Sequence, residues 1–260
     1  MSRRVTAAVV LSLATLAAIF FALPLSGLIV RAPWGEALGI LASPTVYSAL
    51  KLSLISSLSA TLLSLLLGLP LAWLLARVSF PGRRLLRALV TLPLVLPPVV
   101  GGVALLLVLG RVGFVGRWLD ALGVTLFGTL WGVVIAETFV AMPFLVLAVQ
   151  AALESQDRRF EDASATLGAS PWTTFRRVTL PSLGPSLGAG AVLAWARALG
   201  EFGATITFAG NSPGRTQTIP IAVYIQLLSD VDAAIVLSLV LVAVSLVVLI
   251  GLRDRWLTGA

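Results

Sequence analysis

Long apolar runs recur along this chain, and they constrain its fold more than any other feature. Six spans of bilayer length are expected, at residues 5–30, 48–76, 86–110, 126–152, 185–209 and 233–252. A helix needs about 18 or more apolar residues to cross the hydrocarbon, and inside lipid it satisfies its own backbone groups. The sequence therefore predicts an all-α, polytopic membrane protein with one transmembrane domain over residues 1–260.

Composition supports this class and excludes several others. Hydrophobic residues make up 58% of the chain and charged residues only 11%, against about 25% charged in ordinary soluble proteins. The chain has no cysteine and no histidine, which removes disulfides, the common zinc ligands and most nucleophile–base pairs. No glycine-rich loop ending in Lys-Ser or Lys-Thr is present, so ATP binding of that kind is not expected here. We therefore expect no enzymatic activity, metal or cofactor in this chain.

Arginine positions predict the orientation. If both termini share one side, twelve arginines fall on that side and four on the other. The twelve are Arg3, Arg4, Arg77, Arg83, Arg84, Arg87, Arg158, Arg159, Arg176, Arg177, Arg253 and Arg255, and the four are Arg31, Arg111, Arg117 and Arg215. Cytoplasmic loops carry the excess of positive charge, so the termini and residues 77–87 and 153–184 are expected in the cytoplasm. The net charge of +7 is thus explained by topology, without a nucleic-acid partner.

Basic residues stand at the start of each of the first two expected spans. Arg3-Arg4 and the apolar run that follows resemble a signal peptide. The run continues to about Val30 without a clear small-x-small cleavage site, which favours a retained span. Lys51, near the start of the second span, is expected to extend its ammonium to the outer interface.

A polar segment interrupts the apolar pattern at residues 161–181, EDASATLGASPWTTFRRVTLP. Gly168 is expected to break a first helix at about 160–167, and Ser170-Pro171 is typical of the N-cap and first residue of a second one. Leu180-Pro181 is expected to stop it. One interpretation is a solvated interfacial helix; the other is a helix pair that docks onto a soluble partner. The residues expected to couple to such a partner are Glu161, Asp162, Ala163, Ser164, Leu167, Gly168, Arg176, Arg177, Leu180 and Pro181.

The fifth span contains two charged residues, Arg197 and Glu201, four positions apart. That spacing puts both on one helix face, and charges in a span are costly and mark functional or packed interior sites. They either form a structural ion pair or line a translocation path, and Glu137 in the fourth span is a second acid that could share Arg197. The expected path or gate residues are Arg197, Glu201, Gly203, Thr205, Thr207 and Asn211. Ordinary close packing of small residues is the alternative for the glycines and threonines.

The polar segment resembles the cytoplasmic loop of bacterial ABC importer permeases. That loop has the pattern Glu-Ala-Ala, three residues, Gly, nine residues, Ile, one residue, Leu-Pro. Asp162-Ala163-Ser164, Gly168, Val178 and Leu180-Pro181 stand at those spacings. Asp162 replaces the usual Glu, and Ser164 replaces the second Ala. The resemblance implies a fold like that of the type I ABC importers and a coupling loop at about 153–184.

Residues 197–224, RALGEFGATITFAGNSPGRTQTIPIAVY, resemble molybdate and tungstate permeases, with sulfate permeases as near cousins. The resemblance implies a homodimer in a bacterial or archaeal membrane, with two copies of an ATPase that binds ATP and Mg²⁺. It also implies a periplasmic or surface-tethered oxyanion-binding protein. A sulfate or thiosulfate permease remains an alternative. A secondary transporter with Arg197, Glu201 and Glu137 as a charge relay is another, although such carriers need no long docking loop.

Overall fold

The computed structural model describes the backbone of residues 3–257, and its side chains are described for residues 7 and 9–251. Helices and their connections make up this whole range. The long helices are α1 (Arg3–Arg31), α3 (Pro44–Arg77), α7 (Leu130–Ser155) and α14 (Val231–Leu257). The shorter ones are α2 (Ala37–Ala42), α4 (Arg83–Thr91), η1 (Leu92–Leu94), α5 (Pro98–Leu109), α6 (Gly116–Ala121), α8 (Arg159–Thr166), α9 (Pro171–Thr174), the π-helical turn η2 (Phe175–Thr179), α10 (Leu180–Ser182), α11 (Gly184–Leu199), α12 (Gly203–Phe208) and α13 (Ile219–Leu227).

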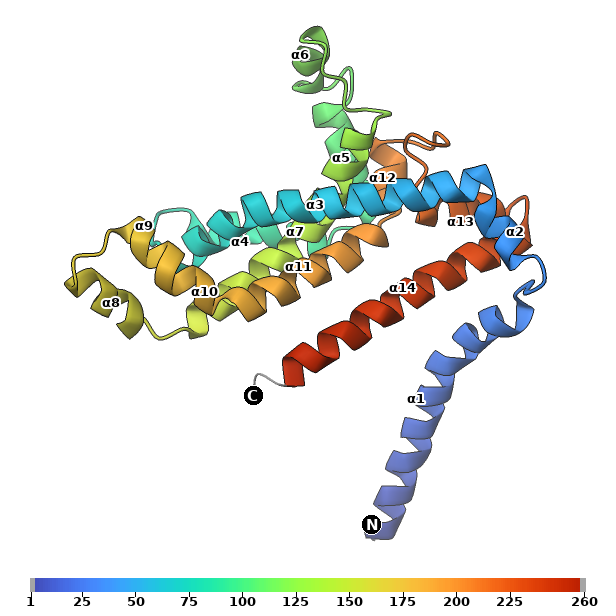
Figure 1. Cartoon of the computed structure of the whole chain (residues 1–260), viewed down its shortest axis with the longest axis horizontal. Helices are drawn as coiled ribbons and strands as arrows, with labels where there is room; N and C mark the ends of the chain where they lie inside the picture. Colours follow the sequence, from blue (N-terminus) through green and yellow to red (C-terminus); the bar gives the residue numbers. More distant parts are fainter. Residues whose placement is uncertain (1–2, 258–260) are drawn as a thin grey trace.

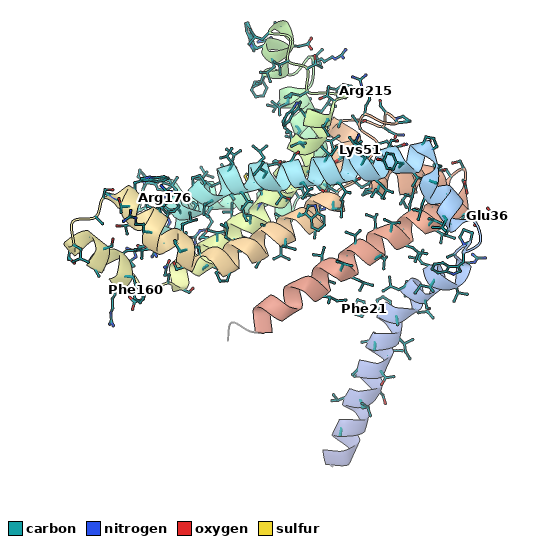
Figure 2. All side chains as sticks on the ribbon, viewed as in Figure 1. Phe21, Glu36, Lys51, Phe160, Arg176 and Arg215 are labelled. Carbon is teal, nitrogen blue, oxygen red and sulfur yellow. The ribbon has the colours of Figure 1, made fainter. Side chains whose placement is uncertain are left out.

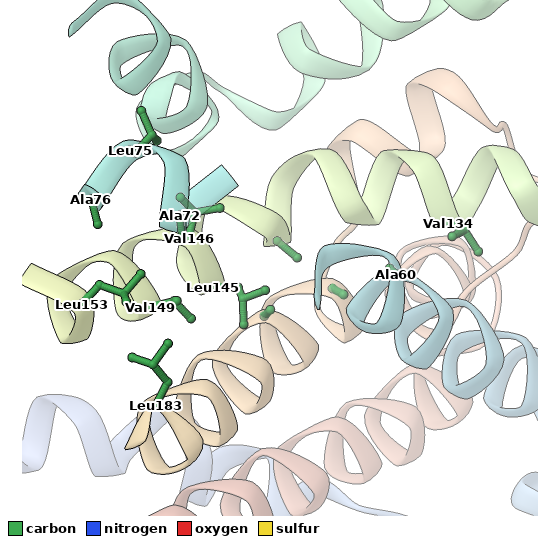
Figure 3. Close-up of a cluster of buried hydrophobic side chains, with 13 residues drawn as sticks. Ala60, Ala72, Leu75, Ala76, Val134, Leu145, Val146, Val149, Leu153 and Leu183 are labelled. Atoms are coloured by element: carbon green, nitrogen blue, oxygen red, sulfur yellow. The ribbon is translucent and has the colours of Figure 1, made fainter. Parts of the chain in front are cut away.

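The core lies where α3, α7 and α11 run side by side (Figure 1). Its buried side chains are mostly alanine, valine and leucine, with Leu145, Leu153 and Leu183 among the largest (Figure 3). Leu145 of α7 fits between two glycines, because a Cβ at Gly68 of α3 or at Gly190 of α11 would lie 3.1 or 3.2 Å from its methyl carbons. Small residues at such contacts let membrane helices approach closely.

The remaining helices extend from this core in three directions (Figure 1). The α8–α10 segment lies at one end of the core, and α2 and α13 lie toward the other. Helices α5, α6 and α12 project to one side. Helix α14 packs against α13, and α1 diverges from the rest, with none of its most apolar window buried. The many exposed apolar side chains on α1 and α14 are suited to lipid.

Four of the six expected spans are confirmed as long apolar helices: α1, α3, α7 and α14. The other two, 86–110 and 185–209, are wrong as single helices. In the first, α4 ends at Thr91 and α5 begins only at Pro98. Pro93, Pro97 and Pro98 cannot donate backbone hydrogen bonds, and proline disfavours helical angles in the preceding residue. Because the residues between α4 and α5 are also apolar, hydropathy did not predict this interruption.

The fifth span is interrupted at Gly200–Phe202, between α11 and α12. Glu201 Oε1 accepts a hydrogen bond from the Ala204 N–H at 2.9 Å, so this side chain caps the start of α12. Helix α13 lies between the expected spans 185–209 and 233–252, where the apolar runs do not predict a span.

The expected stop at Leu180-Pro181 is wrong. The chain stays helical from Pro171 to Ser182 and resumes at Gly184. Proline lacks the N–H for a regular helical bond and its ring crowds the preceding turn. The π-helical turn η2 accommodates Pro181. In this turn the Leu180 N–H donates to Phe175 O, whereas in an α-helix it would donate to Arg176 O. The segment after Gly168 therefore runs continuously into the core.

Candidate coupling segment and buried charge cluster

The α8–α9 unit folds as its sequence indicates. Gly168, two residues beyond the end of α8 at Thr166, adopts φ +83°, in the left-handed region that residues with a Cβ avoid. Ser170 then caps α9 by accepting the Thr173 N–H at 3.2 Å. The predicted helix break and restart are confirmed, and they turn α9 back against α8, where Ser164 Oγ and Thr174 Oγ1 lie 3.0 Å apart.

A half-buried ion pair fixes α8 to the core. Arg77 Nη2, at the end of α3, lies 3.2 Å from Glu161 Oε1. The Thr179 hydroxyl, in η2, donates to the same oxygen at 2.9 Å. The side chains of Arg77 and Glu161 are only 8% and 20% exposed. Glu161 therefore joins three elements, and no pattern in the sequence indicated Arg77 or Thr179 as its partners.

The other residues expected to face a partner divide by exposure. Most are exposed at the end of the molecule: Asp162, Ala163, Leu167, Gly168, Arg176, Arg177 and Pro181. Ser164 and Leu180, like Glu161, are half-buried. One set of these residues is thus exposed, and the other packs within the unit.

Large aromatic and aliphatic side chains lie among the exposed residues of α8 and α9. The aromatic ones were not predicted from the sequence. Leu167, Trp172 and Phe160 are 88%, 68% and 67% exposed, and Trp172 stacks on Phe175 with ring centroids 5.8 Å apart. Figure 2 shows Phe160 and Arg176 at this end, far from Glu36 at the other. Aromatic residues within a polar segment were the available signal, because aromatics are enriched at protein interfaces.

Arg197 and Glu201 do form an ion pair, with Nη2 and Oε2 2.6 Å apart. Glu201 is 1% exposed and Arg197 29%. The pair spans the end of α11 rather than one continuous helix face, since Glu201 lies beyond Leu199. The ion pair therefore links the break between α11 and α12 to the last turn of α11.

Glu137 does not share Arg197, so that expectation is wrong. Its Oε1 accepts from the Ser56 hydroxyl of α3 at 2.8 Å. No ion pair to Glu137 is present within residues 9–251. On the same stretch of α3, Ser57 accepts from the Trp195 indole at 2.9 Å. Serines of α3 thus bind groups on both neighbouring core helices, a pairing that the sequence did not reveal.

The remaining expected path residues do not form one cluster. Gly203 packs on α5, where a Cβ would lie 3.0 Å from Pro98 Cβ, and a Cβ at Gly102 would lie 2.7 Å from Thr207 Cβ. Thr205 is fully buried. Asn211 is exposed and accepts from the Gln217 amide at 2.9 Å. Gly203 and Thr207 thus lie at a tight contact between α12 and α5, and Asn211 lies beyond it.

Comparisons with known proteins agree with this architecture. The family described as binding-protein-dependent transport system inner membrane component matches residues 68–258. The chain is 46% identical to the molybdenum transport system permease protein ModB of Mycobacterium tuberculosis (strain ATCC 25618 / H37Rv), across 91% of this chain and 90% of that protein. For ModB of Escherichia coli (strain K12) the identity is 44%, across 81% of this chain and 93% of that protein. For the sulfate transport system permease protein CysT of E. coli it is 37%, across 97% and 94%.

Solved structures show the same fold. A bacterial ABC transporter involved in the import of the acidic polysaccharide alginate matches with a TM-score of 0.75 at 21% identity, across 96% of this chain and 94% of that one. The MetNI methionine ABC transporter, in an inward-facing conformation, matches with a TM-score of 0.55 at 20% identity, across 84% and 95%. The expected all-α, importer-like fold is therefore confirmed. With most of its length matched, the chain belongs to the inner membrane permease components of binding-protein-dependent ABC transport systems.

Proposed function

We propose that this permease carries a molybdate-type oxyanion into the cytoplasm. The observation that supports this cargo most directly is the 46% identity, over 237 residues, to a relative named a molybdenum transport permease. The sulfate relative is less similar, at 37% over 259 residues. Tungstate has nearly the size and charge of molybdate, so we place selection between these two in a separate binding protein.

The energy for transport would come from a separate ATPase that binds ATP and Mg²⁺. The α8–α9 unit is suited to dock onto it, because exposed Leu167 and Trp172 stand beside exposed Arg176 and Arg177. Apolar anchors with a polar rim are typical of protein interfaces. The helical connection from α9 to α11 would carry movement of the ATPase into the core.

The full assembly would contain two copies of this chain, an ATPase dimer and an oxyanion-binding protein outside the membrane. One solved neighbour is a bacterial alginate ABC transporter in complex with a substrate-bound periplasmic protein, which supports this kind of partner. The excess of arginine near α8–α10 supports placing that end, with both termini, in the cytoplasm.

The Arg197–Glu201 pair would serve as a packing or gating element. Its charges cancel, so it would not repel a dianion as a lone glutamate would. Gly203, Thr205 and Thr207 would keep α12 closely packed, so that it moves together with α5, and Asn211 would lie at the outer mouth.

Uptake by the reconstituted complex tests this function. The permease, its ATPase and its binding protein are placed in liposomes with ATP on the ATPase side, and uptake of radiolabelled molybdate is measured against competing sulfate and tungstate. We expect ATP-dependent molybdate uptake that tungstate suppresses and sulfate does not. Preferential uptake of sulfate would show that the substrate is sulfate, as for the sulfate relatives. Uptake without ATP would indicate a secondary transporter.

A further inference from the structure

A basic pocket lies beside the coupling segment but is separate from it. It has a volume of about 550 Å³ and is lined by Ser79, Phe80, Gly82, Arg83, Arg84, Arg87 and Glu154. Three arginines and one acid give its wall an excess of positive charge. The lining comes from the α3–α4 connection, from α4 and from the end of α7, so the expected docking residues of α8 and α9 do not contribute.

The acid in this wall is already occupied by neighbours. Glu154 Oε1 accepts from Arg87 Nη2 at 2.9 Å and from the Gln150 amide at 2.9 Å, and Arg83 Nη2 lies 3.8 Å away. Arg83 also donates from Nε to Leu75 O at 2.7 Å. The carboxylate is therefore neutralised within the wall, and two positive charges remain in excess.

Two guanidinium groups have donors available for a ligand. Arg84 makes no hydrogen bond or ion pair with any side chain described between residues 9 and 251. The Arg87 side chain is 43% exposed, and only its Nη2 is engaged, by Glu154, in the same part of the chain. A phosphate group presents oxygens that match a guanidinium in charge and geometry, so the donors favour an oxyanion of this class.

Helix α4 also has an apolar face that is suited to lipid. Leu86 and Val90 pack on the core, while Leu85 and Leu89 are 66% and 56% exposed. The arginines occupy the opposite face of the same short helix. A helix with one apolar and one basic face lies in the membrane interface, with its apolar side among the acyl chains. In that orientation the leucine face lies among the acyl chains and the arginine face lies at the level of the headgroups.

We infer that this pocket binds the phosphate headgroup of an anionic phospholipid in the leaflet at the α8–α10 end. Arg84 and Arg87 hold the phosphate, and Leu85 and Leu89 contact the acyl chains. The bound lipid fixes α4 in the interface, and α4 connects α3 to η1 and α5. The inference concerns the membrane environment, so it holds whichever anion the transporter carries.

Lipid retention tests this inference. The permease–ATPase complex is purified from membranes containing phosphatidylglycerol, and native mass spectrometry quantifies the lipid that stays bound. The test variant is Arg84→Gln with Arg87→Gln. Its matched control is Arg159→Gln, which removes the same kind of charge from a side chain that is 91% exposed in α8. Each arginine at an anionic surface contributes about fivefold in binding, so the double variant should retain phosphatidylglycerol about 25-fold more weakly than the parent complex, and each single variant about fivefold more weakly.

Further arms distinguish the source of the phosphate and the role of charge. Phosphatidylcholine should be retained weakly by all variants, and inorganic phosphate should displace phosphatidylglycerol poorly, because it lacks acyl chains. Unchanged retention in the double variant, or an equal loss in Arg159→Gln, would overturn the inference. Tight binding of inorganic phosphate to lipid-free complex, lost in the double variant while lipid is kept, would overturn the lipid as the source. The two single variants, Arg84→Gln and Arg87→Gln, keep the test informative if the double variant is poorly folded.

Discussion

Glu161 of the coupling segment is bound inside the protein by Arg77, with Nη2 and Oε1 3.2 Å apart. Arg77 is the last residue of α3, where a cation also interacts favourably with the helix dipole. Because Thr179 donates to the same carboxylate, a displacement of α8 acts on α3 and on the helix leading to α11. This contact ties the α8–α9 unit to the core.

Glu161→Gln should therefore destabilise the permease. It leaves the nearly buried Arg77 guanidinium without its counter-charge, at a cost of about 1–3 kcal/mol. Thermal aggregation of the purified permease measures the loss. The control is Asp162→Asn, because Asp162 is adjacent, exposed and outside the network. Equal midpoints for the two variants would contradict a structural role for Glu161.

Gly168→Val should disturb the turn between α8 and α9. At φ +83° a β-branched residue is strained by about 1–3 kcal/mol, although no neighbouring atom blocks a Cβ there. We expect the variant to insert into the membrane and to assemble poorly with the ATPase. Ala165→Val, at an exposed position of α8, is the control. Co-purification and transport at parental levels would show that this turn is not needed for coupling.

Neutralising Arg197 or Glu201 singly should reduce transport more than neutralising both. Each single change leaves an unpaired charge in the core, and contacting residues couple by roughly 1 kcal/mol. The measurement is oxyanion uptake by Arg197→Gln, Glu201→Gln and the double variant, normalised to inserted protein. Rescue in the double variant supports packing or gating. Additive losses would exclude the pairing and leave Arg197 as a path residue.

Gly102→Ala should separate α5 from α12. Its Cβ would lie 2.7 Å from Thr207 Cβ and 2.8 Å from Ala204 O, and overpacking of this kind costs about 1–3 kcal/mol. We expect a lower thermal midpoint. Gly39→Ala is the matched control, because a Cβ there meets no atom within 4 Å. A midpoint like that of the control would mean that the two helices are free to move apart.

Cysteine labelling should find Ser170 on the cytoplasmic side. The chain has no native cysteine, so Ser170→Cys provides a unique thiol. An impermeant maleimide should label it only after the cells are opened, because the arginine excess lies on that side. Asn211→Cys, at the other side of the predicted topology, should label in intact cells. Strong labelling of position 170 from outside would reverse the topology.

The sequence by itself determined the membrane class, the four long helices and the helix break at Gly168. These features depend on local composition and on backbone preferences, which neighbouring residues express without help from the rest of the fold. The pairing of Arg197 with Glu201 was also predictable, because four-residue spacing brings side chains together even where α11 is ending.

Only the tertiary structure decided which distant groups meet. Glu161 pairs with Arg77, 84 positions away, and Glu137 takes Ser56, 81 positions away. In a chain this apolar many helix pairings look alike, so hydropathy does not select among them. The interruptions at 92–97 and 200–202 were hidden for the same reason. A broken helix can keep the apolar composition of an intact one, and the structure alone reveals which contacts replace its lost backbone bonds.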